Sequence, residues 1–155
     1  DAHVNVDGGN SIDNAGTSEL AWDVAGTTRV SMMGFTDYRG NQINVVPDLL
    51  LVPVALEQVA FEIVKSAGDP TSNNNKVNFH NGRYDAIVWK YLTGTKRWFM
   101  IDSQMMKQSL AWYWRIILEI FGDGSIMKGT RSLGGYYRTS HGFTDFRWVY
   151  GHNPA

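Results

Sequence analysis

Four histidines are the first side chains to consider for chemistry, because histidine serves both as a general base and as a metal ligand. They are His3, His80, His141 and His152. No two of them have the spacing of a helical or hairpin metal site, and no carboxylate follows in a ligand pattern. The spacing therefore predicts surface or strand-end histidines, with no metal site and no bound cofactor.

Asp102 and Ser103, combined with a distant histidine, are the nearest approach to a hydrolytic site. A nucleophilic serine on a sharp strand-to-helix turn is flanked by glycines, whereas Gln104 and Met105 follow here. A hydrolase that uses Asp102 or the acidic residues near the N-terminus is the weakest of three hypotheses. We expect that the chain is not an enzyme and has no catalytic residue.

Two further patterns resemble ligand loops in composition only. The run from Gly122 to Gly124 has neither the Gly-x-Gly-x-x-Gly nor the Walker pattern, and is typical of a hairpin turn. Asp7 and Asp13 lie among asparagines but lack the repeated Asp frame and the closing Glu of a calcium loop. We therefore expect a turn at 122–124 and an irregular lead-in over residues 1–16.

Basic and aromatic residues gather near the C-terminus, as they do in proteins that bind single-stranded nucleic acid: Tyr137, Arg138, Arg147 and Trp148. Asp145, Tyr136 and Tyr150 fit the alternation of a packed strand equally well. The net charge of −1 supplies no general field to attract nucleic acid. Any contact with DNA is expected to be weak and non-specific.

The composition is that of one soluble domain that can bury a sizeable core. Of its 155 residues 43% are apolar and 19% charged, with 6 Trp, 7 Tyr and 7 Phe. Such an aromatic content fits a β-rich core or a protein–protein contact. The absence of cysteine excludes disulfides and thiolate metal sites, and no apolar run is long enough for a membrane span. Because the chain begins with Asp1, we expect a piece of a longer protein.

Periodicity predicts three helices. The first begins with Thr17 as N-cap, buries Leu20, Val24, Thr28 and Met32, and ends at Gly34. The second begins at Pro53 and carries one apolar stripe: Leu56, Val59, Ala60, Ile63 and Val64. The third, over residues 103–110, is short.

Strand patterns dominate the rest of the chain, over residues 42–46, 49–52, 77–79, 84–89, 97–101, 112–121 and 133–150. The last is interrupted at Gly142, and alternation places Phe146, Trp148 and Tyr150 on one face. Residues 68–75 are polar and predict a mobile surface loop. Because helices come early and strands late, the order favours an α+β fold over a doubly wound sheet.

Several short motifs follow one another along nearly the whole chain: His3 and Asn5 with Asn14 and Gly16, Asp37 with Gly40, the run PDLLLVP at 47–53, Leu56-Glu57 with Ala60, residues 84–92, Trp98 with Asp102, and GFTDFRWVYG at 142–151. In this order the chain resembles the major capsid (head) subunits of tailed bacteriophages with the Hong Kong-97-type fold. It is most similar to the Mu-like prophage head subunits, with Phe146 where those proteins usually have tryptophan.

The resemblance implies an axial-domain-like α+β region over residues 1–110, and the returning antiparallel strands of a peripheral domain over 111–155. It also implies that the N-terminal arm, the projecting hairpin loop and the spine helix, which precede this region in the family, are lacking. The implied function is self-assembly into pentameric and hexameric capsomers and an icosahedral shell enclosing DNA.

The implied partners are other copies of the chain, scaffold and portal proteins and, weakly, packaged DNA, with no membrane. The implied location is the virion capsid, and the host cytoplasm during assembly. The main alternative is a small binding module that recognises carbohydrate or peptide with its aromatic strands. An inward-facing aromatic pocket would favour that module, whereas aromatics on flat flanks would favour the capsid.

Overall fold

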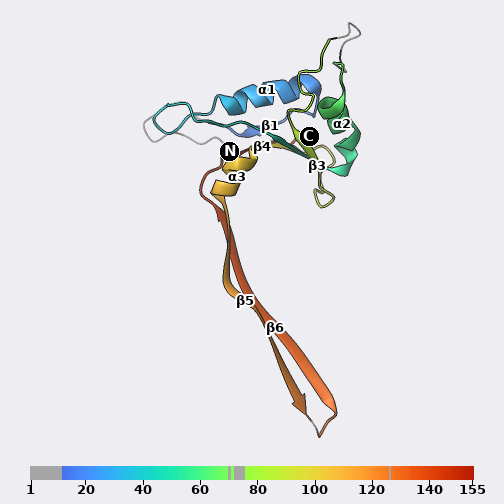
Figure 1. Ribbon diagram of the computed structural model, residues 1–155, viewed down its shortest axis with the longest axis vertical. Helices are drawn as coiled ribbons and strands as arrows, with labels where there is room; N and C mark the ends of the chain where they lie inside the picture. The colour runs from blue at the N-terminus through green and yellow to red at the C-terminus, as the bar shows by residue number, and fades with distance from the viewer. Residues whose placement is uncertain (1–11, 70, 72–75, 126) are drawn as a thin grey trace.

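A long β-hairpin projects from a body of helices packed on a sheet (Figure 1). The computed structural model describes residues 12–69, 71, 76–125 and 127–155. The body contains β1 (Ala15–Gly16), α1 (Trp22–Met33), β2 (Leu49–Val52), the 3₁₀ turn η1 (Val54–Leu56), α2 (Glu57–Lys65), β3 (Asp85–Val88), β4 (Trp98–Ile101), α3 (Ser103–Ser109) and β7 (Val149–His152). The hairpin consists of β5 (Leu110–Ser125) and β6 (Thr130–Phe143). The arrangement is a mixed α+β fold, as predicted.

The body is organised around a five-stranded sheet with the order β1-β7-β4-β2-β3. β4 runs antiparallel to both of its neighbours, whereas the outer pairs β1–β7 and β2–β3 are parallel. Residues from both ends of the chain therefore meet in one sheet. The last strand, β7, lies in this sheet and not with the long strands of the hairpin, although both fall within the predicted unit 111–155.

One face of the sheet and two helices form the core. Leu50 and Met100, paired across β2 and β4, are completely buried, as are Met32 of α1 and Ala60 of α2. Trp98 is also completely buried, and its indole donates a hydrogen bond to the Ser18 carbonyl at 3.1 Å. Burying large apolar side chains is the main favourable term in folding, so this layer carries most of the stability of the body.

The predicted β2 strand and the helix after Pro53 are confirmed. Leu50 and Val52 point into the core, and α2 buries Ala60, Ile63 and Val64 of the predicted stripe. The helical segment opens with the η1 turn, and its exposed side carries Glu57, Glu62 and Lys65. The strands over β3 and β4 and the short helix α3 are confirmed as well.

The first helix begins at Trp22, so the prediction of Thr17 as its N-cap is wrong. The backbone before it is held by tertiary bonds, because the Ser18 N–H donates to His152 Nδ1 at 3.3 Å while the Ser18 carbonyl accepts from Trp98. Thr28 and Met32 are buried on the helix and Gly34 ends it, as predicted. Leu20 is buried but lies outside the helix.

The predicted strands over 42–46 and 77–79 are wrong, because each provides only an isolated bridge, Thr36 with Gln42 and Gly68 with Val77. Near the second bridge, the Asn78 amide donates to the carbonyls of Ile63 and Ser66 at 2.7 and 2.9 Å, which ties this segment to the end of α2. Pro70 and residues 72–75 of the predicted loop lie outside the described residues.

The hairpin is longer than the sequence pattern predicts, and the predicted turn at 122–124 is wrong. Those residues continue the ladder, with Gly122 opposite Leu133 and Gly124 opposite Arg131. The chain reverses after Ser125, where Gly129 adopts a φ of 61° that favours glycine. The late strands form this projecting hairpin (Figure 1), which lies at a different place in the chain from the hairpin loop that precedes this region in the resembled family.

The predicted division of the last segment into two strands is confirmed, but Gly142 lies within β6 opposite Ala111, and the break falls between Phe143 and Val149. The predicted shared face of Phe146, Trp148 and Tyr150 is wrong, because the first two lie in the intervening turn. The Asp145 carboxylate stabilises that turn by accepting from the Arg147 N–H at 3.0 Å and from its guanidinium at 3.2 Å.

Candidate functional site

The surface of the β5–β6 hairpin is the most unusual feature of the described structure. More than half of the exposed large apolar side chains found among the described residues lie on it: Leu110, Trp112, Tyr113, Trp114, Ile117, Leu118, Ile120, Phe121, Met127, Leu133, Tyr136, Tyr137 and Phe143. Soluble monomers rarely expose a continuous apolar patch of this kind unless it contacts a partner.

Four rings near the base of the hairpin form an aromatic ladder of Trp112, Trp114, Tyr137 and His141. Trp112 lies opposite His141 in the strand register and stacks on it at 5.8 Å between ring centroids. Trp114 is 6.2 Å from Trp112 and 6.5 Å from Tyr137. The three large rings of the ladder remain 58–61% exposed. Their contacts with each other orient them without burying them.

A register shift follows the ladder directly. The regular pairing that ends with Trp114 opposite Thr139 resumes with Ile116 opposite Arg138, and a second shift lies between Ile116 and Glu119. Extra residues of this kind bend and twist a strand pair locally. Two-stranded sheets are marginally stable in water by themselves. The hairpin therefore has a locally bent apolar surface, and contacts with another surface would stabilise it.

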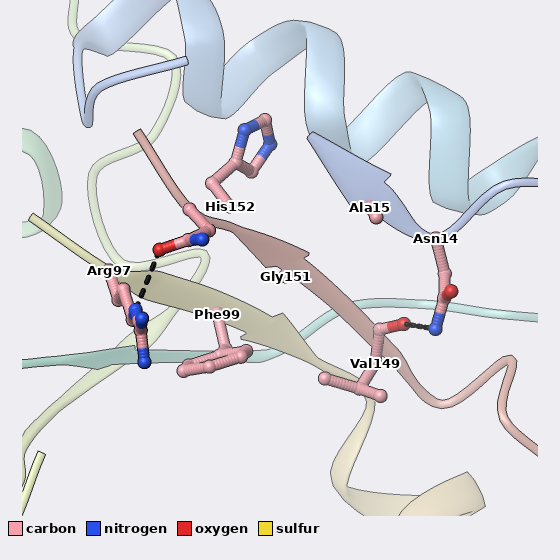
Figure 2. A pocket seen from close by; sticks show the side chains of 8 residues that line it. Asn14, Ala15, Arg97, Phe99, Val149, Gly151 and His152 are labelled. Carbon is pink, nitrogen blue, oxygen red and sulfur yellow. Dashed lines mark hydrogen bonds between the residues drawn. The ribbon is translucent and has the colours of Figure 1, made fainter. Parts of the chain in front are cut away.

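A pocket of about 440 Å³ lies on the body where both ends of the chain meet (Figure 2). Asn14 Nδ2 donates to the Val149 carbonyl at 3.2 Å, and Arg97 Nε donates to Asn153 Oδ1 at 2.6 Å. The Phe99 ring lies against Gly151, where a Cβ would approach it to 2.9 Å. The residues lining the pocket hold strands together and include no nucleophile beside a base.

His152 faces away from this pocket toward α1 (Figure 2). Because the Ser18 N–H can only donate, Nδ1 of His152 accepts and carries no proton. Nε2 then carries the proton and donates to Thr28 Oγ1 at 2.9 Å. Burial lowers the pKa of His152. This histidine is a neutral structural group of the core.

The other described histidines lie at separate places and do not form a site with His152. His80 is buried, and its Nε2 donates to the Trp22 carbonyl at 3.0 Å. Burial lowers its pKa as well. His141 belongs to the aromatic ladder, and His3 lies outside the described residues. Within the described part of the chain, no three histidine or acidic side chains are placed to hold a metal ion.

Asp102 caps α3, and Ser103 is bound to Asp48. Asp102 accepts from the N–H groups of Gln104 and Met105 at 3.0 and 2.9 Å, and from the Val46 N–H at 2.8 Å. The Ser103 hydroxyl donates to Asp48 Oδ2 at 2.5 Å. A serine bonded to a carboxylate has no general base of the serine-hydrolase type. The sequence signal for the capping role was an Asp directly before a helix, a preferred N-cap.

The remaining predicted candidates are dispersed. Tyr137 and Arg138 lie on the hairpin, whereas Arg147 and Trp148 lie in the turn before β7, so the structure does not bring them to one surface. Asp13 accepts from the Ala15 N–H at 3.0 Å, and Asp7 lies outside the described residues. Sequence reasoning missed the grouping of Trp112, Trp114 and His141, although the alternating tryptophans were a visible signal.

A protein-family model described as "Phage capsid protein" matches residues 2–151, and the chain belongs to this family. No curated protein and no solved structure gives a significant match. Proteins of this family are structural components of the bacteriophage capsid, which places the chain in the virion. No helix within the described residues has the length and apolar character needed to cross a membrane.

Proposed function

We propose that the chain is a major capsid subunit with the Hong Kong-97-type fold, most similar to the head subunits of Mu-like phages and prophages. In this proposal copies of the chain self-assemble into pentameric and hexameric capsomers, and these form the icosahedral shell that encloses the DNA. Membership of the phage capsid family supports the role, and the geometry of the hairpin supports self-assembly.

The observation that carries the proposal is the exposed apolar surface of the hairpin. β5 has 16 residues and, at about 3.3 Å per residue, extends roughly 50 Å. A monomer would keep these apolar side chains in water, at a cost of about 25 cal/mol for each Å² left uncovered. A repeated contact between different surfaces of neighbouring copies covers them and closes into rings.

The same geometry supports a division of the chain into two parts with different roles. The sheet and its helices, within residues 1–110 and completed by β7, act as the axial part. The hairpin within 111–155 acts as the peripheral part. The near-neutral net charge limits repulsion between closely packed copies. It also supports only weak, non-specific contact with packaged DNA. Scaffold and portal proteins complete the proposed set of partners, and assembly takes place in the host cytoplasm.

The aromatic ladder is the observation that favours the second candidate, a module that binds carbohydrate or peptide. Exposed rings in a row offer faces on which a flat ligand can stack. However, the ladder lies on a strand pair, and its three large rings are more than half exposed. Flat aromatic flanks fit contact with another protein surface better.

Hairpin deletion tests the proposal. Replacing residues 112–141 by a short glycine-containing turn leaves the residues of the five-stranded sheet intact. We expect the unaltered chain to form rings or shells in negative-stain microscopy and to sediment as oligomers, and the shortened chain to remain monomeric. A monomeric unaltered chain that binds sugars or peptides through Trp112 and Trp114 would replace the capsid proposal by the binding module.

A further inference from the structure

A groove lies between α2 and β3, at the edge of the five-stranded sheet. It has a volume of about 240 Å³ and is called the edge groove here; it is lined by Glu57, Phe61, Val64, Lys65, Asp85, Ala86 and Val88. The Phe61 ring at its rim is 64% exposed. A groove between a helix and an edge strand has the form in which proteins accept an additional extended strand.

β3 has an open backbone edge beside this groove. Its only partner strand among the described residues is β2, to which it runs parallel. The N–H groups of Asp85 and Trp89 donate to Asp48 and Val52 on that side, at 2.8 and 2.9 Å. Because alternate residues of a strand point their N–H groups to opposite sides, those of Ala86 and Val88 face outward.

The rim of the edge groove is acidic. Glu57 and Asp85 line it and are exposed, and Lys65 is the one basic residue among its lining side chains. Neither carboxylate forms a salt bridge with another described residue. This edge of the body therefore presents unpaired negative charge next to an exposed aromatic ring and an open strand.

The hairpin has the complementary properties. Its residues 110–143 contain four basic and two acidic side chains, a formal charge of +2 that leaves −3 on the rest of the chain, whose total is −1. The basic residues are exposed and form no salt bridge within the described part of the chain: Arg115, Lys128, Arg131 and Arg138. Among the described residues each hairpin strand pairs only with the other, so its outer edge has no described partner strand.

We propose that the edge groove of one copy receives the β5–β6 hairpin of a second copy. One hairpin strand extends the sheet beyond β3, its apolar side chains cover Phe61, and its basic residues face Glu57 and Asp85. The hairpin projects away from its own body, so the occupant is another molecule (Figure 1). The contact joins two different surfaces and therefore propagates from copy to copy. This inference rests on the proposed capsid function.

Cysteine cross-linking tests the contact directly, because the chain has no cysteine of its own. A chain with Ala86→Cys is mixed with chains that carry a single hairpin cysteine, in a series of Ile117→Cys, Phe121→Cys, Leu133→Cys and Tyr137→Cys. A disulfide requires Cα atoms within about 7 Å, so at least one pair should give a disulfide-linked dimer at least about fivefold above the control. In the control, Val30→Cys replaces Ala86→Cys in the same mixtures; Val30 is exposed on α1.

Charge reversal supplies the second readout. Glu57→Arg should weaken self-association about tenfold, and Arg138→Glu in the partner should restore it, because opposite charges again face each other. Asp23→Arg, on the exposed side of α1, is the matched control and should have no effect.

If the unaltered chain forms oligomers but no pair cross-links above the control and Glu57→Arg has no effect, the docking site is wrong while the capsid proposal stands. A chain that is monomeric at every concentration overturns both.

Discussion

Trp98 in the body and Trp112 in the hairpin occupy the same kind of local position but have opposite surroundings. Each is a strand residue directly opposite a histidine, Trp98 with His152 and Trp112 with His141, and each stacks on that histidine. Trp98 is 0% exposed, whereas Trp112 is 60% exposed. The stacked Trp–His pair therefore does not by itself determine whether the tryptophan is buried. What packs over the pair determines it. α1 covers the first pair, and no described residue covers the second.

The comparison predicts that substitution of Trp98 affects the stability of the body, whereas substitution of Trp112 affects assembly. Trp98→Ala should lower the free energy of unfolding by about 3–5 kcal/mol, because it leaves a large cavity and removes the bond to Ser18. Urea unfolding followed by circular dichroism measures the loss. A loss below about 1 kcal/mol is typical of surface substitutions. It would show that the core around Trp98 does not provide most of the stability of the body.

Asp102→Ala should have the next largest effect, about 2–3 kcal/mol, because it leaves three backbone N–H groups without their acceptor. Asp102→Asn is the matched control and should lose about half as much, since its single carbonyl oxygen still caps α3. Thermal melting of both variants checks the order. Equal losses would mean that the charge, and not the capping geometry, is what matters.

The body should also respond to pH through its two buried histidines. Burial lowers the pKa values of His80 and His152, so each binds a proton more readily in the unfolded chain, where the usual value is 6.5. Their contribution to stability is complete above pH 6.5 and is lost as the pH falls through the range below it. Urea unfolding on both sides of that pH measures the change, and His152→Gln should reduce it. An unchanged pH dependence in this variant would exclude His152 as a contributor.

Shortening the loop after α2 should have a small effect on the body. The Asp69 N–H donates to the Lys76 carbonyl at 2.8 Å, so a turn that joins these two residues keeps the bridge between Gly68 and Val77. We expect a stability change within about 1 kcal/mol, because loop length costs little entropy. Thermal melting measures it. The family resemblance implies that a loop after this helix lies toward the capsomer centre, so we expect ring yield to fall more than stability.

The sequence was sufficient to predict a secondary-structure element where the pattern of buried residues coincides with the period of that element. The strand at Leu50 and Val52 and the helix stripe at Ala60, Ile63 and Val64 were predicted because each pattern fits only one element. Other segments depend on distant partners. Ser18 is kept out of the first helix by His152 and Trp98, residues that no local pattern connects with it.

The hairpin and its surface were predicted only in part. A Gly-x-Gly run fits a turn as well as a strand, and the register starting from Leu110 opposite Phe143 places Gly122 and Gly124 within the ladder. Aromatic strands were correctly found, but whether their rings face a core or solvent depends on what packs against them. Only the tertiary structure shows that Trp112 is uncovered.

Sedimentation velocity of a ladder variant is the most direct test that the hairpin is the assembly surface. Trp112→Ser combined with Trp114→Ser should change the free energy of unfolding of the body by less than about 1 kcal/mol, because both rings are largely exposed. The same variant should lose the rings or larger oligomers that the unaltered chain forms. Oligomers of normal size and yield in this variant would contradict the account, because the exposed aromatic ladder would then contribute nothing to assembly.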